Sequence, residues 1–194
     1  MNGSSLFELI DIVCDLMDRS GIVYAITGSV ASSAYSEPYT SVDVALCLHA
    51  SPAAVESFLK IIPGRLYHHD EAIRDAARRH SMINLTDNQT GWKVNLSFMP
   101  ESGYLAQVLS RRQEIQYGLQ GKSYWTVSPE DIILKKLQYY SEGASDKHTR
   151  DIASLLKVVG AGIDKAYIER WAKTLGVADL WAIVRQRAEG PPNA

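Results

Sequence analysis

The chain has 194 residues, of which 46% are hydrophobic and 22% are charged, with a formal net charge of −2. This composition is typical of a globular protein of one or two small domains, and the charge gives no general attraction to nucleic acids or anionic membranes. No apolar run is long enough to span a membrane, and no basic segment precedes an apolar one at the N-terminus. We therefore expect a cytoplasmic protein with no membrane partner and no strong nucleic-acid signal. Cys14 and Cys47 fall in a predicted helix and a predicted strand, and we expect both to be buried thiols.

Capping residues and helix breakers predict the helices of the first 112 residues. The predicted helices are 5–18, opened by the capping box Ser5–Glu8; 30–35, which is short and rich in alanine and serine; 51–62, opened by Ser51 and Pro52; 70–80, capped by Asp70; and 102–112.

Runs of β-branched and aromatic residues predict the strands. The predicted strands are 22–27, 42–48, 81–86, 92–98, 113–117 and 122–127, with hairpin turns at 87–91 and 118–121. Strand 42–48 is apolar except for Asp43, so it should be largely buried. A carboxylate in such a strand must be paired, hydrogen-bonded, protonated or bound to a metal.

Gly28 and Ser29 end the first strand and precede the short helix. Glycine permits a tight turn and a close approach of the backbone to a ligand. The free N–H groups of the helix would then lie beside Gly28 and Ser29, where an anionic phosphate is favoured. An ordinary turn at the end of a strand explains the same two residues. They are evidence for a phosphate site only because of their spacing to Asp43.

From residue 128 onward the composition is helical. Ser128 and Pro129 are followed by two acidic residues, which together mark the start of a helix. The predicted helices are 129–141, 146–158, 164–174 and 177–188, with glycines between them. The chain therefore divides into an α/β part, residues 1–127, and a helical part, residues 128–190.

The sequence Gly28-Ser29, thirteen further residues and then Asp43 resembles the entry motif of nucleotidyltransferases of the polymerase-β type. The resemblance continues through strand 92–98 and through residues 128–137 and 145–151, so it covers most of the chain. The wider chain resembles uncharacterised bacterial proteins that are distantly similar to abortive-infection nucleotidyltransferase toxins. The resemblance implies an α+β fold: a small mixed β-sheet nucleotidyltransferase core with flanking helices, followed by a C-terminal helical bundle.

The chain departs from the family's pattern at two of its three carboxylate positions. The family has its second carboxylate where this chain has Ala45, and its third where this chain has Asn95. The resemblance implies that Asp43 is the catalytic residue and that Asp43 and Asn95 are the metal ligands. Asp43 and Asn95 are expected side by side near Ser29.

These departures change what the site can bind. Because side chains alternate along a strand, Asp43 and Ala45 share one face of their strand, and Lys93, Asn95 and Ser97 share one face of theirs. Asp43 supplies one negative charge and Asn95 a neutral carbonyl, whereas Ala45 supplies no ligand. A pair of Mg²⁺ ions needs shared anionic oxygens. We therefore predict weak Mg²⁺ binding at most, and two-metal catalysis that is absent or strongly impaired, with a nucleoside triphosphate as the candidate ligand.

A second set of candidate residues lies in the helical part. The resemblance implies that Lys135, Lys136 and Asp151 face the nucleotide, together with Gly28 and Ser29. A lysine there would neutralise triphosphate charge, and Asp151 would orient it or bind a base. A salt bridge between two helices, for example Lys136 with Asp151, explains the same residues equally well.

Three functional hypotheses remain. The first is a nucleotidyltransferase-fold protein that has lost catalysis and still binds a nucleotide or a protein partner. The second is an active Mg²⁺-dependent transferase that modifies protein or RNA, with Glu37 or Asp87 as a substitute metal ligand. The third is a non-catalytic interaction module of a bacterial defence or toxin–antitoxin pair. The two missing carboxylates favour the first.

Overall fold

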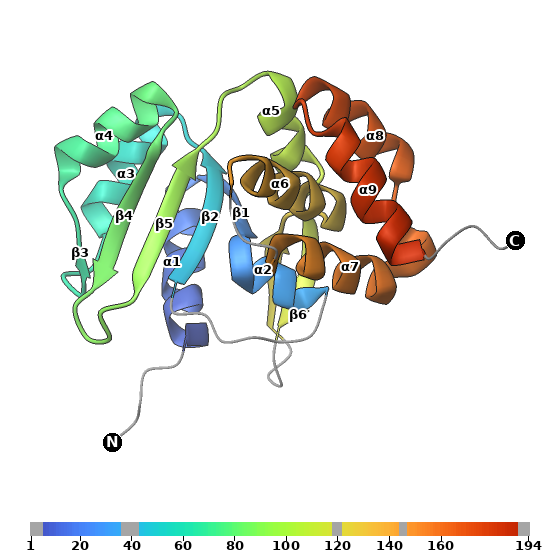
Figure 1. The fold of residues 1–194 in the computed structure, drawn as a ribbon. Helices are drawn as coiled ribbons and strands as arrows, with labels where there is room; N and C mark the ends of the chain where they lie inside the picture. Colours follow the sequence, from blue (N-terminus) through green and yellow to red (C-terminus); the bar gives the residue numbers. More distant parts are fainter. Residues whose placement is uncertain (1–5, 36–42, 118–121, 144–146, 190–194) are drawn as a thin grey trace, which may run out of the picture. The chain divides into compact units, whose positions relative to one another are not determined.

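The computed structural model describes residues 6–35, 43–117, 122–143 and 147–189 (Figure 1). Strands and helices are interspersed up to β7, and the described residues after β7 form only helices and turns. In chain order the elements are α1 (Leu6–Ser20), β1 (Val23–Thr27), α2 (Gly28–Ala34), β2 (Asp43–His49), α3 (Pro52–Ile61), β3 (Leu66–Tyr67), α4 (Asp70–Arg79), β4 (Met82–Asp87), β5 (Lys93–Phe98), α5 (Gly103–Ser110), β6 (Gln113–Tyr117), β7 (Lys122–Thr126), α6 (Pro129–Ser141), α7 (Lys147–Val159), η1 (Gly160–Gly162), α8 (Lys165–Thr174) and α9 (Ala178–Glu189). None of the helices in these ranges is both long and apolar enough to cross a lipid bilayer.

Seven strands within the described ranges form one mixed sheet, in the order β3-β4-β5-β2-β1-β7-β6 (Figure 1). The pairs β2–β5 and β1–β7 are parallel, whereas β1–β2, β3–β4, β4–β5 and β6–β7 are antiparallel. A mixed sheet with flanking helices is thus followed by a run of helices. This arrangement confirms the predicted α+β fold class.

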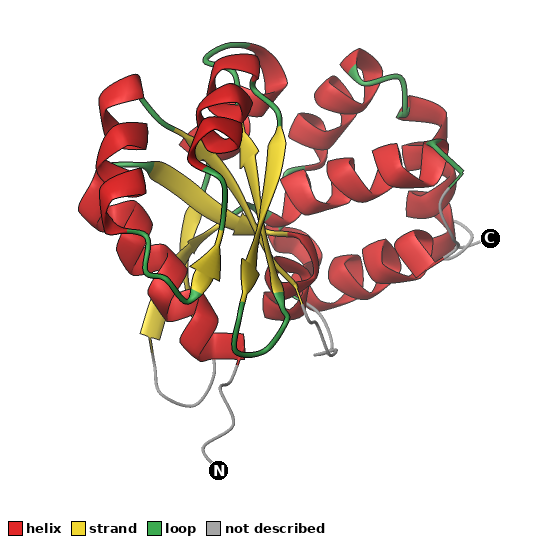
Figure 2. Ribbon diagram, turned by 90° about the vertical axis from the view of Figure 1, so that its left-hand side faces the viewer, coloured by secondary structure: helices red, strands yellow, loops and turns green. Residues whose placement is uncertain are grey.

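One face of the sheet is apolar and buried. Val44 lies directly opposite Val94, and Leu46 directly opposite Leu96, and all four side chains are fully buried. Helices α1 and α4 pack on this face, with α3 against both of them, and Figure 2 shows helices beside the strands. Phe58 of α3 is among the largest fully buried side chains. Burial of each such side chain contributes about 1.5–3 kcal/mol to folding.

Helix starts were predicted well where the cap has no competing partner. The hydroxyl of Ser51 accepts a hydrogen bond from the N–H of Ala54 at 3.2 Å and so opens α3 as predicted. The prediction that Asp70 caps α4 is wrong, because His69 takes the cap position and makes no side-chain capping bond. Asp70 is instead the first helical residue, with its carboxylate 3.3 Å from the ring of His68.

Other differences from the predicted elements are small. Helix α2 begins at Gly28, two residues earlier than predicted, so Gly28 and Ser29 form its first turn rather than a separate one. Strand β3 has only two residues and was not predicted. Cys14 and Cys47 are buried thiols that form no disulfide, as predicted, and burial raises the pKa of Cys14 to about 12. The predicted cap at Ser5 lies outside the described residues.

The chain forms two compact units: residues 1–30 with 39–127, and residues 31–38 with 128–194. In the second unit, the hydroxyl of Ser128 accepts a hydrogen bond from the N–H of Asp131 at 3.3 Å, which confirms the predicted start of α6. Two buried carboxylates then hold the start of α6 to the start of α8. Glu130 accepts from the N–H of Asp164, and Asp131 accepts from the hydroxyl of Tyr167, both at 2.9 Å.

Candidate functional site

The register of β2 and β5 brings candidate residues together on the face of the sheet opposite the buried one, here called the polar face. The two strands are parallel, with Asp43 directly opposite Lys93 and Ala45 directly opposite Asn95. Residues directly opposite one another share a face of the sheet, so Asp43 and Asn95 are diagonal neighbours on the polar face. The prediction that these two side chains share one face is confirmed, while their catalytic and metal-binding roles stay predictions.

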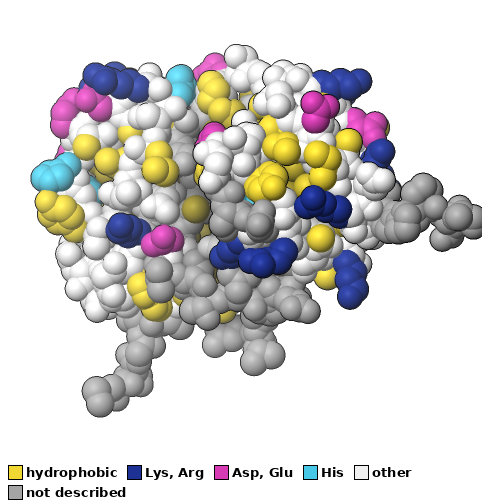
Figure 3. Space-filling view, viewed as in Figure 1, with side chains coloured by type: hydrophobic (Ala, Val, Ile, Leu, Met, Phe, Trp, Pro, Cys, Tyr) yellow, Lys and Arg dark blue, Asp and Glu magenta, His cyan; other side chains and the backbone are white. Residues whose placement is uncertain are grey.

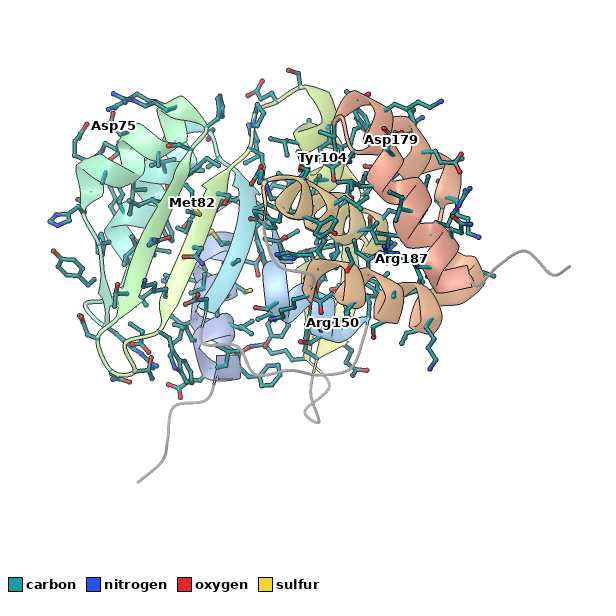
Figure 4. All side chains as sticks on the ribbon, in the orientation of Figure 1. Asp75, Met82, Tyr104, Arg150, Asp179 and Arg187 are labelled. Carbon is teal, nitrogen blue, oxygen red and sulfur yellow. The ribbon has the colours of Figure 1, made fainter. Side chains whose placement is uncertain are left out.

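The polar face continues from β5 onto β4. Asn84 lies directly opposite Asn95, and Thr86 lies directly opposite Lys93. The side chains of Asn84 and Lys93 are exposed, and Met82, labelled in Figure 4, is 61% exposed. Figure 3 shows that the surface over β4 and β5 is mostly neither charged nor apolar. Hydrogen-bonding groups on these two strands are therefore accessible to a ligand in solution.

Gly28 joins β1 directly to α2, beside Ala45. Thr27, the last residue of β1, lies directly opposite Ala45. Gly28 has a φ of +67°, and a Cβ atom at this position would lie 3.3 Å from the Cβ of Ala45. The backbone conformation and the close neighbour both favour a residue without a Cβ atom. The glycine of the motif is thus explained by local geometry next to the position where the family has its second carboxylate.

Replacing Gly28 with alanine is expected to lower the free energy of unfolding by about 1–3 kcal/mol, because the new Cβ atom adds backbone strain to a tight contact. Urea unfolding followed by tryptophan fluorescence measures this change. Gly21→Ala is the matched control, since Gly21 has a φ of +71° and no atom within 4 Å of an added Cβ. A loss at Gly28 no larger than the loss at Gly21 would show that the contact with Ala45 does not matter.

The structure overturns Asp87 as a substitute metal ligand. Asp87 alternates with Asn84 and Thr86 of the same strand, so it lies on the buried face, and it is 0% exposed. The guanidinium of Arg65 donates to both carboxylate oxygens of Asp87, at 2.8 and 2.9 Å. The hydroxyl of Thr90 donates to one of these oxygens at 2.6 Å. Glu37, the other proposed substitute, lies outside the described residues.

The same contacts fix the charge state of Asp87 and the turn that follows it. Hydrogen bonds from Arg65 lower the pKa of Asp87 to about 2, although burial opposes this shift. The turn itself is closed by the N–H of Gly91, which donates to the carbonyl of Asp87 at 2.7 Å, while the N–H of Asn88 donates to the carbonyl of Arg65 at 2.9 Å. Lys93 begins the strand that follows this turn. The buried Arg65–Asp87 ion pair therefore anchors the end of the polar face on which Lys93 lies.

On the paired strands β2 and β5, Asp43 has no second carboxylate beside it on the polar face. Its neighbours on the polar face are a methyl group at Ala45, an amide at Asn95 and a cation at Lys93. In the part of the chain that the structure describes, no three His, Cys, Asp or Glu side chains gather as a group that could hold a metal ion. Two metal ions close together require several bridging anionic oxygens.

In the helical unit, Lys136 and Asp151 form the salt bridge that was one of the two interpretations of these residues. The ammonium of Lys136 lies 2.6 Å from the carboxylate of Asp151, and these side chains are only 11% and 18% exposed. The neighbouring Lys135 places its ammonium 4.6 Å from the centre of the Tyr139 ring. The roles of Lys135, Lys136 and Asp151 in nucleotide binding stay predictions.

Sequence reasoning assigned no role to Lys93 or Arg65, whose neighbours in the folded chain are distant in the sequence. Strand alternation placed Lys93 on the face of Asn95, but only the pairing of β5 with β2 puts it opposite Asp43. No local signal marks Arg65, because its partner Asp87 is 22 residues away and the contact depends on the folded chain.

No model of a known protein family matches the chain, and no curated protein matches it either. Solved structures do match. The antibiotic-resistance factor ANT(2'')-Ia has a TM-score of 0.56 and 14% identity, covering 94% of this chain and 96% of its own. The lincosamide antibiotic adenylyltransferase LnuA has a TM-score of 0.53 and 15% identity, covering 81% of this chain and 99% of its own. An antigenic nucleotidyltransferase-like protein from Paracoccidioides brasiliensis has a TM-score of 0.52 and 17% identity, covering 91% and 90%.

These similarities extend over most of each chain at low sequence identity. Such a likeness establishes the arrangement of helices and strands and leaves the chemistry to be argued from the site. The match includes the mixed sheet and the helices that follow it, as the resemblance of the sequence implied. The chain therefore has the nucleotidyltransferase fold.

Proposed function

We propose that this protein binds a nucleotide on the polar face of its sheet and does not carry out two-metal nucleotidyl transfer. The observation that carries this proposal is the register of β2 and β5, which surrounds Asp43 with Ala45, Asn95 and Lys93. In the family that the sequence resembles, carboxylates stand at the positions of Ala45 and Asn95.

Electrostatic repulsion opposes two-metal transfer at this site. Mg²⁺ selects hard anionic oxygens, and two such ions, one at the attacking and one at the leaving oxygen, repel each other unless carboxylates bridge them. Asp43 contributes one carboxylate, and the amide of Asn95 contributes a neutral oxygen that offsets no charge. Lys93 on the neighbouring strand adds a positive charge, which disfavours a divalent cation at the same place.

The solved structures support an adenine nucleotide as the first ligand to test. LnuA is described as an adenylyltransferase, and a structure of ANT(2'')-Ia holds adenylyl-2''-tobramycin. For this chain, the amides of Asn84 and Asn95 on the polar face supply both donors and acceptors for such a ligand. Binding of a nucleotide by these amides does not require the carboxylates that this chain lacks.

We expect ATP, GTP, CTP or UTP to raise the melting temperature, and no nucleotide to be consumed. A ligand that binds only the folded state at 100 times its Kd stabilises it by about 2.7 kcal/mol. The measurement pairs a thermal-shift titration, with and without Mg²⁺ or Mn²⁺, with an assay for release of pyrophosphate. Asp43→Asn is the control, because any release that persists in this variant does not come from the site.

Pyrophosphate release that is lost in Asp43→Asn would contradict the proposal and favour the active transferase. Absence of a thermal shift with all four nucleotides would also contradict it and favour the interaction module. A thermal shift without release of pyrophosphate is the expected result.

A further inference from the structure

Lys93 supplies a positive charge beside Asp43, the residue for which the sequence resemblance implies a metal-binding role. It is directly opposite Asp43 on the neighbouring parallel strand, and the two residues share the polar face. On its other side, Lys93 is directly opposite Thr86 of β4. The lysine side chain is exposed, so its ammonium can reach a ligand that lies over the strands.

The charge balance of this cluster opposes the binding of an anion less than the family's three carboxylates would. The formal charges of Asp43 and Lys93 cancel, and Ala45 and Asn95 are neutral. Three carboxylates at these positions would instead repel a polyphosphate unless metal ions were bound. An exposed ion pair between Asp43 and Lys93 would be worth little, so it would not prevent a highly charged phosphate chain from binding the ammonium.

The neighbouring side chains complete a set of phosphate-binding donors. Lysine is a compact point charge with three N–H donors and is a common phosphate ligand. Asn95 lies one step along the same face of β5, and Asn84 lies directly opposite Asn95 on β4. Each asparagine carries an NH₂ group that can donate to a phosphate oxygen without adding negative charge.

We propose that Lys93 replaces the divalent cation at this site, so that the protein binds the triphosphate of a nucleotide without metal. This inference rests on the proposed function and specifies the chemistry of the same site. The backbone supports it, because the Arg65–Asp87 ion pair anchors the turn immediately before Lys93 and thereby fixes the position of the strand end.

The test is calorimetric titration of the full chain with inorganic triphosphate and with ATP, in EDTA and in Mg²⁺. We expect both ligands to bind in EDTA, and Lys93→Gln to weaken binding roughly tenfold or more, because the variant loses a charged hydrogen-bond donor to the phosphates. Lys93→Arg, which keeps the charge, should retain most of the affinity. The affinity of the wild type should fall as salt is raised, and that of Lys93→Gln should depend less on salt.

Lys60→Gln is the matched control, because Lys60 is an exposed lysine on α3, among the helices that cover the buried face. Equal affinity of the wild type and Lys93→Gln in EDTA would overturn the role of Lys93 and leave the proposed function standing. Binding by the wild type only in Mg²⁺ would also overturn it. Absence of ATP binding under both conditions would overturn the proposed function as well.

Discussion

Replacing Arg65 with leucine is expected to lower the free energy of unfolding by about 3–5 kcal/mol, because it leaves the buried carboxylate of Asp87 without its cation. Arg65 donates two hydrogen bonds to Asp87 and a third, at 2.5 Å, to Glu8. Urea unfolding at neutral pH, followed by circular dichroism, measures the loss. The double variant Arg65→Leu, Asp87→Asn should be more stable than Arg65→Leu alone, because the uncompensated charge is gone.

Arg74→Leu is the matched control for this prediction. The guanidinium of Arg74 likewise donates two hydrogen bonds to the carboxylate of Glu56, at 2.7 and 3.0 Å. These two side chains, however, are 31% and 50% exposed. Over α4, Figure 3 shows basic and acidic side chains close together on the surface. Water replaces the lost partner of Glu56, so the loss should be much smaller than at Arg65. Equal losses at the two sites would show that burial of Asp87 is not what makes its pair important.

The same ion pair predicts how stability changes with pH. The folded pKa of Asp87 is lowered to about 2, below its value in the unfolded chain. Its contribution is therefore complete above the unfolded pKa of about 4 and is lost as the pH falls towards 2, with a magnitude of roughly 2 kcal/mol. Urea unfolding of the wild type and of Asp87→Asn between pH 2 and pH 6 tests this. The stability difference between the two proteins should shrink over that acidic range, and a constant difference would contradict the assignment.

Restoring the two missing carboxylates with Ala45→Asp and Asn95→Asp is expected to create a divalent-metal site. Together with Asp43, the new side chains would occupy adjacent positions on one face of β2 and β5. We expect the affinity for Mn²⁺ or Mg²⁺ to rise about tenfold or more, equivalent to at least 1.4 kcal/mol of binding free energy. Without metal, repulsion among three carboxylates should lower the melting temperature, and added metal should restore it. Calorimetry with Mn²⁺ and a thermal-shift titration measure both effects.

The control for this variant adds the same charge at neighbouring positions. Thr86→Asp with Ser97→Asp places two carboxylates on the polar face, opposite Lys93 and Cys47 rather than beside Asp43. We expect this control to gain far less metal affinity than the restored variant. A similar gain in both would mean that general negative charge attracts the metal, and the assignment of Asp43, Ala45 and Asn95 to the family's metal positions would fail.

Local signals in the sequence were sufficient to predict most elements of this fold. Caps such as Ser51 and Ser128 use side-chain oxygens to satisfy nearby N–H groups, so their effect is contained within a few residues. Strand alternation likewise predicted that Asp43 and Ala45 share a face. The cap at Asp70 was predicted wrongly, since its carboxylate pairs with His68, which precedes the helix. The resemblance carried by Gly28, Ser29 and Asp43 indicated the fold that the solved structures then supported.

The tertiary structure alone decided which of these side chains meet. The register that sets Lys93 opposite Asp43 joins strands separated by several elements, and it follows from how Val44 and Leu46 pack against the core. Arg65 finds Asp87 22 residues later in the sequence, at a position where burial makes the pair strong. The sequence by itself determined most of the elements, because caps and strand alternation depend on neighbouring residues, and its resemblance to the family implied which carboxylates are replaced. The charge balance around Asp43 depends on strand pairing, which the sequence does not express locally.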